Sequence, residues 1–174
     1  MKLKKATLAK AAKATLYSLD GKNYSFAFKY NPTSISITES ISLSENGGAR
    51  TEKDGIPKVS FACPEAKTIS IQDIVFDSYE DDKGKDVFSQ LQQLTKAVKF
   101  ISGEQRPPVY LFRWGAIHYA YCYVESIDYE LTMFSPDGTP VRANASISMK
   151  EVDPYDVSSN PPPKPKRGSD TRWL

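Results

Sequence analysis

The chain has 174 residues, of which 40% are hydrophobic, 25% charged and 11% aromatic. This composition is typical of one well-cored globular domain and excludes collagen-like and wholly disordered chains. No uninterrupted apolar run approaches the ~18 residues that a membrane-spanning helix needs. The two cysteines, Cys63 and Cys122, and the single histidine, His118, are too few for a disulfide scaffold, a four-ligand zinc site or most catalytic triads.

The net charge of +2 is unevenly distributed along the chain. Residues 1–15 carry five lysines and no acid, and residues 158–174 carry four basic residues and one acid. The segment between them has 14 basic and 20 acidic residues and a net charge of −6. The basic isoelectric point therefore describes the two ends and does not predict a basic binding face on the fold. Because lysines interrupt the first 13 residues, an export signal is not indicated, and we expect a cytoplasmic protein with reduced thiols.

Three segments follow from this distribution. Residues 1–12 form a basic N-terminal extension, residues 13–157 form the folded domain, and residues 158–174 form a proline-rich basic tail. The run from Pro161 to Lys166 contains four prolines and two lysines, which is typical of an extended polyproline-like linker.

Most of the domain has the two-residue periodicity of β-strands. Leu16 to Leu19 precede Asp20-Gly21, which is typical of a hairpin turn. Further strands are predicted, in chain order, around 24–30, 35–43, 59–61, 69–76, 109–114, 118–133 and 141–149. A slip in the alternation within 69–76 indicates a β-bulge. Residues 44–56 contain Asn46-Gly47-Gly48 and no periodic apolar set, so we expect a long flexible loop there.

One segment has helical periodicity. Its apolar residues recur at the spacing of one helix face: Val87, Leu91, Leu94, Val98 and Ile101. Asp86 suits the N-cap, and Gly103 with Pro107-Pro108 ends the segment. About eight strands and one helix predict a mainly β (α+β) fold, an antiparallel β-barrel or sandwich with one flanking α-helix.

Enzyme signatures are nearly lacking. The chain has neither a glycine-rich phosphate loop nor a dinucleotide fingerprint. The acids between Asp73 and Asp86 do not have the spacing of a calcium loop, and a Cys63–His118 pair lies in no nucleophile motif. We therefore predict no catalytic residues, no metal and no cofactor. His118 is expected to be a hydrogen-bonded structural residue.

Seven aromatic residues fall between Tyr110 and Tyr129. They suit packing within a sheet, a subunit interface rich in tyrosine, or stacking on single-stranded nucleic acid. Arg113 is the only basic residue between 109 and 130, although a nucleic-acid groove needs several. Packing is the favoured interpretation, and nucleic-acid binding stays as an alternative.

Several stretches occur together in a characteristic order. They are Lys13–Leu16, FAFKYNPTSISI (26–37), PKVSF (57–61), IVFDSY (74–79), RPPV (106–109), FRWG (112–115) and LTMFSPDGTPVRANA (131–145). Over residues 13–152 this pattern resembles the N-terminal domain of contractile injection system tube proteins. These are phage-tail-like baseplate components that join the inner tube to the spike.

The resemblance implies a phage tail-tube-like fold and a structural role. Six copies would form a tube-initiator ring that adapts the spike hub to the inner tube at the baseplate. The implied partners are the chain itself, the inner tube protein, a trimeric spike or hub protein and a baseplate or sheath adaptor, without nucleic acid or membrane insertion. The alternative within the same machine is a main inner-tube subunit. Family members often carry a LysM domain after a proline-rich linker. Here six residues follow the linker at 160–168, so no LysM domain and no peptidoglycan binding are expected.

The residues predicted to make subunit contacts come from several segments. The candidates are Tyr119, Tyr121, Tyr123, Asn46, Arg142 and Trp173. The tyrosines belong to the predicted hairpin 117–134, and Asn46 belongs to the predicted loop 44–56. Arg142 is expected to pair with an acid across a subunit joint. Trp173 is a candidate anchor because tryptophan is enriched at interfaces, with a free terminal tail as the alternative. Asp137-Gly138 is expected to set a turn in which glycine supplies a positive φ.

Overall fold

A computed structural model describes residues 11–50, 54–79, 87–157 and 172–173. The strands are β1 (Ala14–Ser18), β2 (Phe26–Ala27), β3 (Ser36–Thr38), β4 (Ile41–Arg50), β5 (Pro57–Pro64), β6 (Thr68–Asp77), β7 (Val109–Trp114), β8 (Ile117–Phe134), β9 (Pro140–Glu151) and β10 (Arg172–Trp173). The helices are α1 (Val87–Thr95), α2 (Pro154–Val157) and the 3-10 turns η1 (Lys22–Tyr24) and η2 (Lys96–Val98). Within the described residues no helix has the length and apolar character to cross a membrane.

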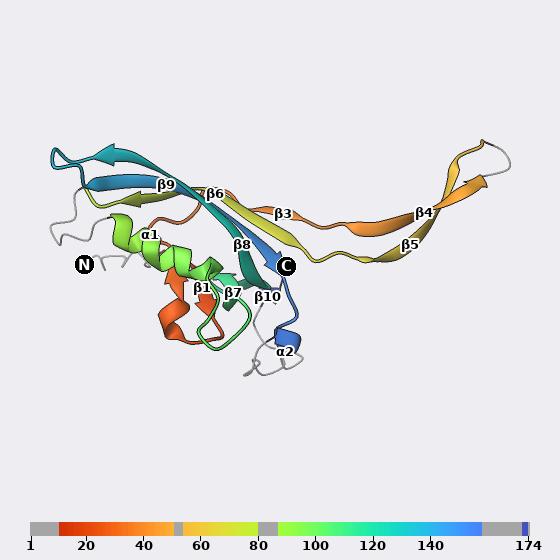
Figure 1. Ribbon diagram of the computed structural model, residues 1–174, viewed down its shortest axis with the longest axis horizontal. Helices are drawn as coiled ribbons and strands as arrows, with labels where there is room; N and C mark the ends of the chain where they lie inside the picture. The colour runs from red at the N-terminus through yellow and green to blue at the C-terminus, as the bar shows by residue number, and fades with distance from the viewer. Residues whose placement is uncertain (1–10, 51–53, 80–86, 158–171, 174) are drawn as a thin grey trace, which may run out of the picture.

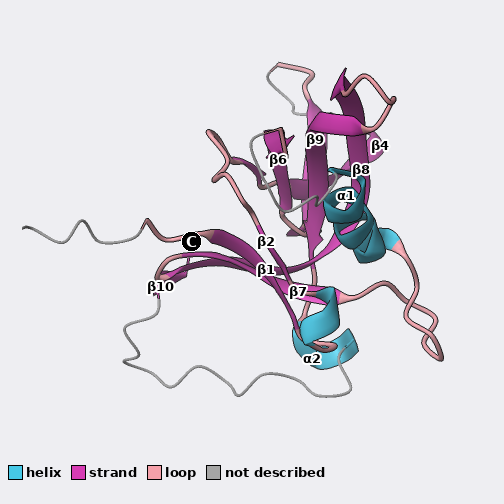
Figure 2. Ribbon diagram, turned by 90° about the vertical axis from the view of Figure 1, so that its left-hand side faces the viewer, coloured by secondary structure: helices cyan, strands magenta, loops and turns pink. Residues whose placement is uncertain are grey.

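The main sheet has the strand order β2-β1-β7-β8-β9-β6-β3, and its neighbours pair antiparallel. The short β10 adds to β8 in parallel. The sheet is curled, so that β1, β2 and β7 cross β6, β8 and β9 steeply, with α1 lying in the angle between them (Figure 2). The mainly β fold with a flanking helix, predicted from the sequence, is confirmed. The order runs from β2 to β3 without closing, so a single chain forms an open, curled sheet.

The longest strand, β8, connects the two halves of this sheet. Its first part pairs with β7 as far as Tyr123, and its second part pairs with β9 as far as Phe134. The register of β8 against β9 shifts between Val124 and Ser126, which is a β-bulge at Glu125. A bulge increases local twist and bend, and it lies where β8 passes from one half of the sheet to the other.

The predicted bulge in β6 is confirmed. The pairing of β6 with β9 shifts between Ile71 and Ile74, and Asp73 within the shift has a φ of 55°. The extra residue restores the inward orientation after Ile71, so Ile74 and Phe76 are also buried. Without the bulge, the alternation of apolar residues would place half of this strand's apolar side chains in solvent.

The core lies between α1 and the concave side of the sheet (Figure 1). Val87, Leu91 and Leu94 of α1 are buried, as the helical spacing predicts. The helix ends earlier than the pattern indicated, because α1 gives way to η2 after Thr95. Val98 is consequently partly exposed. Asp86, the expected N-cap, lies outside the described residues.

The prediction of a flexible loop at 44–56 is wrong for its first half. Residues 44–50 belong to β4, which pairs with β5 to form a long two-stranded hairpin. The register shifts between Glu45 and Arg50, so Asn46-Gly47-Gly48 lie in an irregular stretch of strand. Sequence periodicity missed this segment because residues 44–50 carry no alternating apolar pattern, and cross-strand backbone pairing does not require one. Residues 51–53 lie outside the described part.

The basic extension and the proline-rich tail are largely beyond the described residues, which omit 1–10 and 158–171. Between them, the described domain begins at Ala11 and continues through α2. These are the limits of the described residues, so the predicted segment boundaries stay a prediction.

Candidate assembly surface

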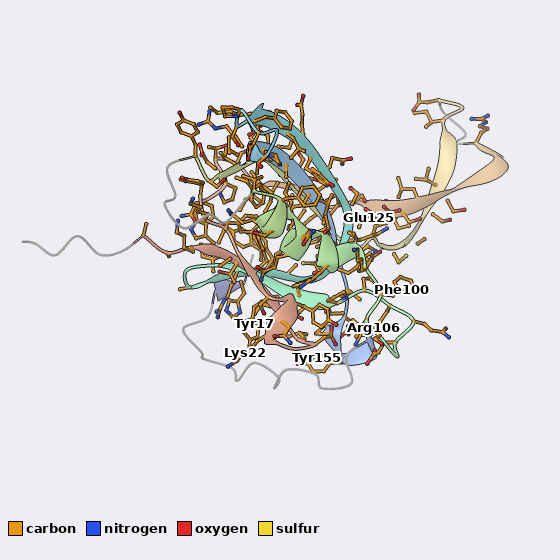
Figure 3. All side chains as sticks on the ribbon, turned by 60° about the vertical axis from the view of Figure 1, so that its left-hand side comes forward. Tyr17, Lys22, Phe100, Arg106, Glu125 and Tyr155 are labelled. Atoms are coloured by element: carbon orange, nitrogen blue, oxygen red, sulfur yellow. The ribbon has the colours of Figure 1, made fainter. Side chains whose placement is uncertain are left out.

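The hairpin of β4 and β5, here called the arm (residues 41–64), extends far from the body of the molecule (Figure 1). Its side chains project into open space on both sides, in contrast to the crowded body (Figure 3). Five large apolar residues of the arm are exposed: Ile41, Leu43, Ile56, Val59 and, at 77% exposure, Phe61. A two-stranded hairpin with no buried face is at best marginally stable in water, so the arm is suited to contact another molecule.

Polar contacts fix the root of the arm to the body. The backbone carbonyl of Ser40 accepts a 2.9 Å hydrogen bond from the amide of Glu65, which closes the base of the hairpin. The Ser40 hydroxyl donates to Glu65 Oε2 at 2.7 Å. Lys67 forms a 3.0 Å ion pair with Glu39, and its amide donates to Glu151 Oε2 at 3.1 Å. The arm therefore leaves the body from a defined position.

The second half of β8 (from Glu125), together with β9 and β6, forms a three-stranded unit that we call the strip. One face of the strip packs on the core, and the residues that alternate with the core positions lie on the opposite face. These outward residues are mostly small and polar: Ser126, Asp128, Glu130, Thr132, Arg142, Asn144, Ser146, Ser148, Lys150, Thr68, Ser70 and Gln72. Such a face is suited to water and is poorly suited to burial against protein.

The strip has unpaired edges on both sides. Among the described residues, β8 beyond Tyr123 has β9 as its only strand partner, and β6 beyond Ser70 also pairs only with β9. Unpaired strand edges present backbone donors and acceptors to another chain. The two edges belong to different strands, so joining one to the other between copies would be a heterologous contact.

The structure gives Arg142 an acidic partner within its own chain. Its Nε and Nη2 donate to Asp77 Oδ2 at 2.9 Å and 2.6 Å, between neighbouring residues of β9 and β6. A hydrogen bond from the Tyr79 amide and those from Arg142 lower the pKa of Asp77, against a smaller opposing effect of burial. The predicted pairing of Arg142 across a subunit joint would therefore compete with this intrachain pair.

The three candidate tyrosines occupy alternate positions along β8, and each is half-buried. Tyr119 packs against Phe112, with 4.9 Å between ring centroids. Tyr121 lies beside Glu151 and Val152 in an open groove, and Tyr123 lines a small apolar pocket with Val109 and Val152.

The other aromatic residues of this region mainly pack within the fold. Tyr110 and Phe112 are fully buried, while Tyr129 is 46% exposed. The cluster is thus spread between the core and the surface, and it does not present a continuous platform for stacking bases.

The last two candidates lie at the chain's periphery. Trp173 belongs to β10 and pairs with His118, so the backbone of this part of the tail is attached to the sheet in this chain. Asn46 lies in the irregular stretch of β4, toward the far end of the arm.

The residues of the enzyme hypothesis are not assembled into a site. Cys63 is exposed on β5 of the arm, whereas His118 begins β8 in the body. Burial, and then the charge of Arg113, lower the pKa of His118. Burial raises the pKa of the Cys122 thiol to about 12, so that thiol is inert near neutral pH. The described residues contain no group of three or more His, Cys, Asp or Glu side chains that could hold a metal ion.

Sequence reasoning missed one ion pair that fixes the body. Arg106 donates to both carboxylate oxygens of Asp20, at 3.0 Å and 2.8 Å, and the Val109 amide donates to Asp20 Oδ2 at 2.8 Å. The sequence indicates a hairpin turn at Asp20-Gly21. A turn accounts for the presence of Gly21 but does not predict that the Asp20 carboxylate binds Arg106. The two partners are 86 positions apart in the sequence, so no local pattern indicates the contact.

A sequence model of the family described as contractile injection system tube protein matches residues 2–159. No curated protein matches this chain.

Proposed function

Because the chain belongs to the contractile injection system tube protein family, whose role is structural, we propose that six copies form a tube-initiator ring. This ring would adapt the trimeric spike hub to the inner tube at the baseplate. The remaining proposed contacts are with the inner tube protein and with a baseplate or sheath adaptor. The proposed site of action is the cytoplasm, in an assembling phage tail-like particle.

The observation that carries this proposal is the strip, with an unpaired edge on each side and a polar outer face. Pairing the β8 edge of one copy with the β6 edge of the next would remove both edges from solvent. Heterologous joining of this kind produces a closed ring when the rotation per copy divides a full turn. The small polar residues of the outer face would then line a water-filled channel.

The arm supports the same proposal independently. Its exposed apolar residues, above all Phe61, would be buried if the arm lay across a neighbouring copy. Asn46 near its far end and the tyrosines of β8 remain our candidates for such contacts. The arm is attached to its own body and would also contact a neighbouring copy. It would therefore fix the position of one copy relative to the next.

Electron microscopy of particles from cells with and without the gene tests this proposal. We expect sheathed particles to disappear on deletion and to return on complementation. Gold labelling of a tagged chain is expected at one end of each particle, beside the baseplate. Intact particles in the deletion strain would refute a role in initiation.

A main inner-tube subunit is the second candidate, and the family's description as a tube protein favours it. An open strip and an arm would serve either role equally well. Copy number distinguishes them, because an initiator contributes one ring to each particle and a tube subunit contributes many. Quantitative mass spectrometry of purified particles, with the spike protein as the internal standard, gives the ratio directly.

A further inference from the structure

A groove runs along the root of the arm on the surface of the body. Two adjoining hollows of about 550 Å³ and 630 Å³ share Pro64, Glu65 and Glu151 in their walls. We call these two neighbouring hollows together the root groove. Its remaining walls come from the start of the arm, from Tyr119–Tyr121 of β8 and from the segment after β9.

The root groove is strongly acidic. Four carboxylates and one base line it: Glu39, Glu65, Glu151, Asp153 and Lys67. Lys67 is held by Glu39, and this hydrogen bond raises the pKa of the lysine. Glu65 and Asp153 accept hydrogen bonds from neutral donors, the Ser40 hydroxyl and the Tyr155 amide. Glu151 accepts one from the Lys67 amide and also interacts with the charge of Lys67. Such contacts orient the carboxylates and leave their negative charge in place.

Part of the floor of the groove is an unpaired strand edge. β10 pairs with β8 at Ile117 and His118, and the amide of Val152 donates to the carbonyl of Tyr121 at 2.9 Å. Between these two contacts, the described residues leave the edge of β8 at Tyr119 without a strand partner. Only Tyr119 and Ala120 lie between these contacts, so a bound peptide would be held mainly by the acidic walls.

The chain itself carries a segment of matching chemistry. Residues 1–13 contain five lysines and no acid, whereas residues 158–171 contain three basic residues and one acid. The N-terminal extension is therefore the better electrostatic complement of a groove with a net charge of −3.

The register of β1 places the described start of the chain, residues 11–13, on the side away from the root groove. Ala14 lies opposite Trp114, at the end of β7, and the Ala12 carbonyl accepts a 3.1 Å hydrogen bond from Trp114 Nε1. β1 and β8 run in the same direction, since both are antiparallel to β7. Residues 11–13 therefore lie on the side of the β7–β8 turn, whereas Tyr119 lies in the opposite direction along β8. β10 also lies between this turn and the root groove.

We infer that the root groove binds the basic N-terminal extension, residues 1–12, of a second copy of this chain. The inference rests on the proposed function in requiring a neighbouring copy, and it adds a third contact between copies to those of the strip and the arm. Because the bound segment and the groove are different surfaces, this contact is also heterologous and propagates from copy to copy.

Binding of a fluorescent peptide that copies residues 1–13 tests the charge complementarity on the full-length protein. We expect saturable binding by anisotropy that weakens about tenfold between 50 and 500 mM NaCl, since salt screens exposed charges. A peptide with its five lysines replaced by glutamine is expected to lose binding. An unchanged affinity of that peptide, or the lack of any saturable binding, would overturn the inference.

Matched variants locate the binding site. The isosteric double variant Glu65→Gln/Asp153→Asn removes two charges from the groove, and we expect it to weaken peptide binding about tenfold. The control Asp128→Asn/Glu130→Gln removes two charges from the polar face of the strip and should bind as the unmodified protein does. Equal weakening in both variants would show attraction to the overall charge and would contradict a site in the groove.

A peptide that copies residues 158–171 examines the other basic segment. We expect it to bind at least tenfold more weakly than the peptide of residues 1–13. Tighter binding by the tail peptide, with displacement of the first peptide, would overturn the assignment of the occupant.

Cross-linking in the assembled protein separates this inference from the proposed ring. Cys63 lies two residues from Glu65, so a donor chain with Leu3→Cys and Cys63→Ser can link to the native Cys63 of a tagged acceptor chain only between copies. We expect a donor–acceptor product with a short bis-maleimide, and none when the acceptor also carries Cys63→Ser. Rings in native mass spectra without this product would refute the groove contact alone. The cross-linked product in the absence of rings would support the groove contact and refute the proposed ring.

Discussion

At the scale of single residues, Asp20 connects two distant parts of the body through Arg106 and Val109. Its side chain is only 7% exposed. Burial by itself would raise the pKa of Asp20, but the hydrogen bonds and charge of Arg106, with the Val109 amide, together lower it below the usual 3.8. A carboxylate whose pKa is lowered by folding stabilises the folded state above the pKa of the unfolded chain. That stabilisation is lost as the pH falls through the folded-state pKa.

We expect Asp20→Asn to lower the free energy of unfolding at pH 7 by about 2 kcal/mol, because Arg106 loses its charged partner in a largely buried position. The difference between the variant and the unmodified protein should shrink as the pH falls from 6 to 3. Urea titrations at both pH values measure it, with Asp128→Asn as an exposed control. A difference that is constant with pH would show that the charge of Asp20 is not what stabilises the fold.

The two cysteines are expected to differ in reactivity because the fold gives them opposite environments. Cys63 is exposed on the arm, whereas Cys122 is buried with a pKa of about 12. A thiol reacts as its thiolate, so one thiol per chain should react with Ellman's reagent near pH 8 and two should react in denaturant. Cys63→Ser should abolish the native reaction. Two rapidly reacting thiols in the native protein would contradict the burial of Cys122.

At the scale of elements, α1 covers the core. Substitutions on its buried and exposed faces are expected to change the free energy of unfolding by different amounts. Leu91 is 2% exposed and Phe88 is 43% exposed on the same helix. Leu91→Ala leaves a cavity against the sheet and should lower the free energy of unfolding by about 3 kcal/mol. Phe88→Ala should change it by less than about 1 kcal/mol, since its ring already contacts water. Chemical denaturation of both variants compares them, and equal losses would contradict this orientation of α1.

Both α1 and β6 show what the spacing of apolar residues can predict within one element. The 3.6-residue spacing identified the buried face of α1, and the slip after Ile71 identified the bulge of β6, because both patterns record which side chains are buried. Ile41 and Leu43 also alternate correctly for a strand, yet both are exposed. The alternation of apolar residues therefore predicted a strand there, but it did not show whether another surface of the molecule covers their side chains.

At the scale of the whole molecule, the body and the arm are structurally separable. The hydrogen bonds between Ser40 and Glu65 that close the base of the arm involve residues outside 42–63, so a short turn can replace that stretch and leave them in place. We expect a variant in which Asn-Gly replaces residues 42–63 to fold with a melting temperature within about 3 °C of the intact chain. It should fail to restore particles to a deletion strain, because the apolar contacts of the arm are missing.

Circular dichroism on heating tests the fold of this variant, and complementation tests its assembly. Phe61→Ser provides a milder companion, since it removes the most exposed ring of the arm and leaves the hairpin in place. Full complementation by the armless variant would exclude the arm from assembly. Unfolding of that variant would contradict the separation of body and arm.

The sequence by itself determined the elements whose side-chain pattern records burial. The period-two strands of the body, the helix at Val87, the turn at Asp137-Gly138 and the bulge of β6 were all predicted, and Gly138 has the expected positive φ of 86°. The order of motifs also identified the family correctly. These features were predictable because each depends on residues that are neighbours in the chain.

Only the tertiary structure decided the features that depend on distant segments. The arm replaced an expected loop because backbone pairing between Glu45 and Val59 holds it, and such pairing leaves no apolar signature. The ion pair of Asp20 with Arg106 and the acidic root groove likewise join residues far apart in sequence. The pattern of apolar and polar residues along the sequence indicates whether a side chain is buried or exposed. It does not indicate which distant residue that side chain contacts. That choice is made when the sheet curls and brings its strands together.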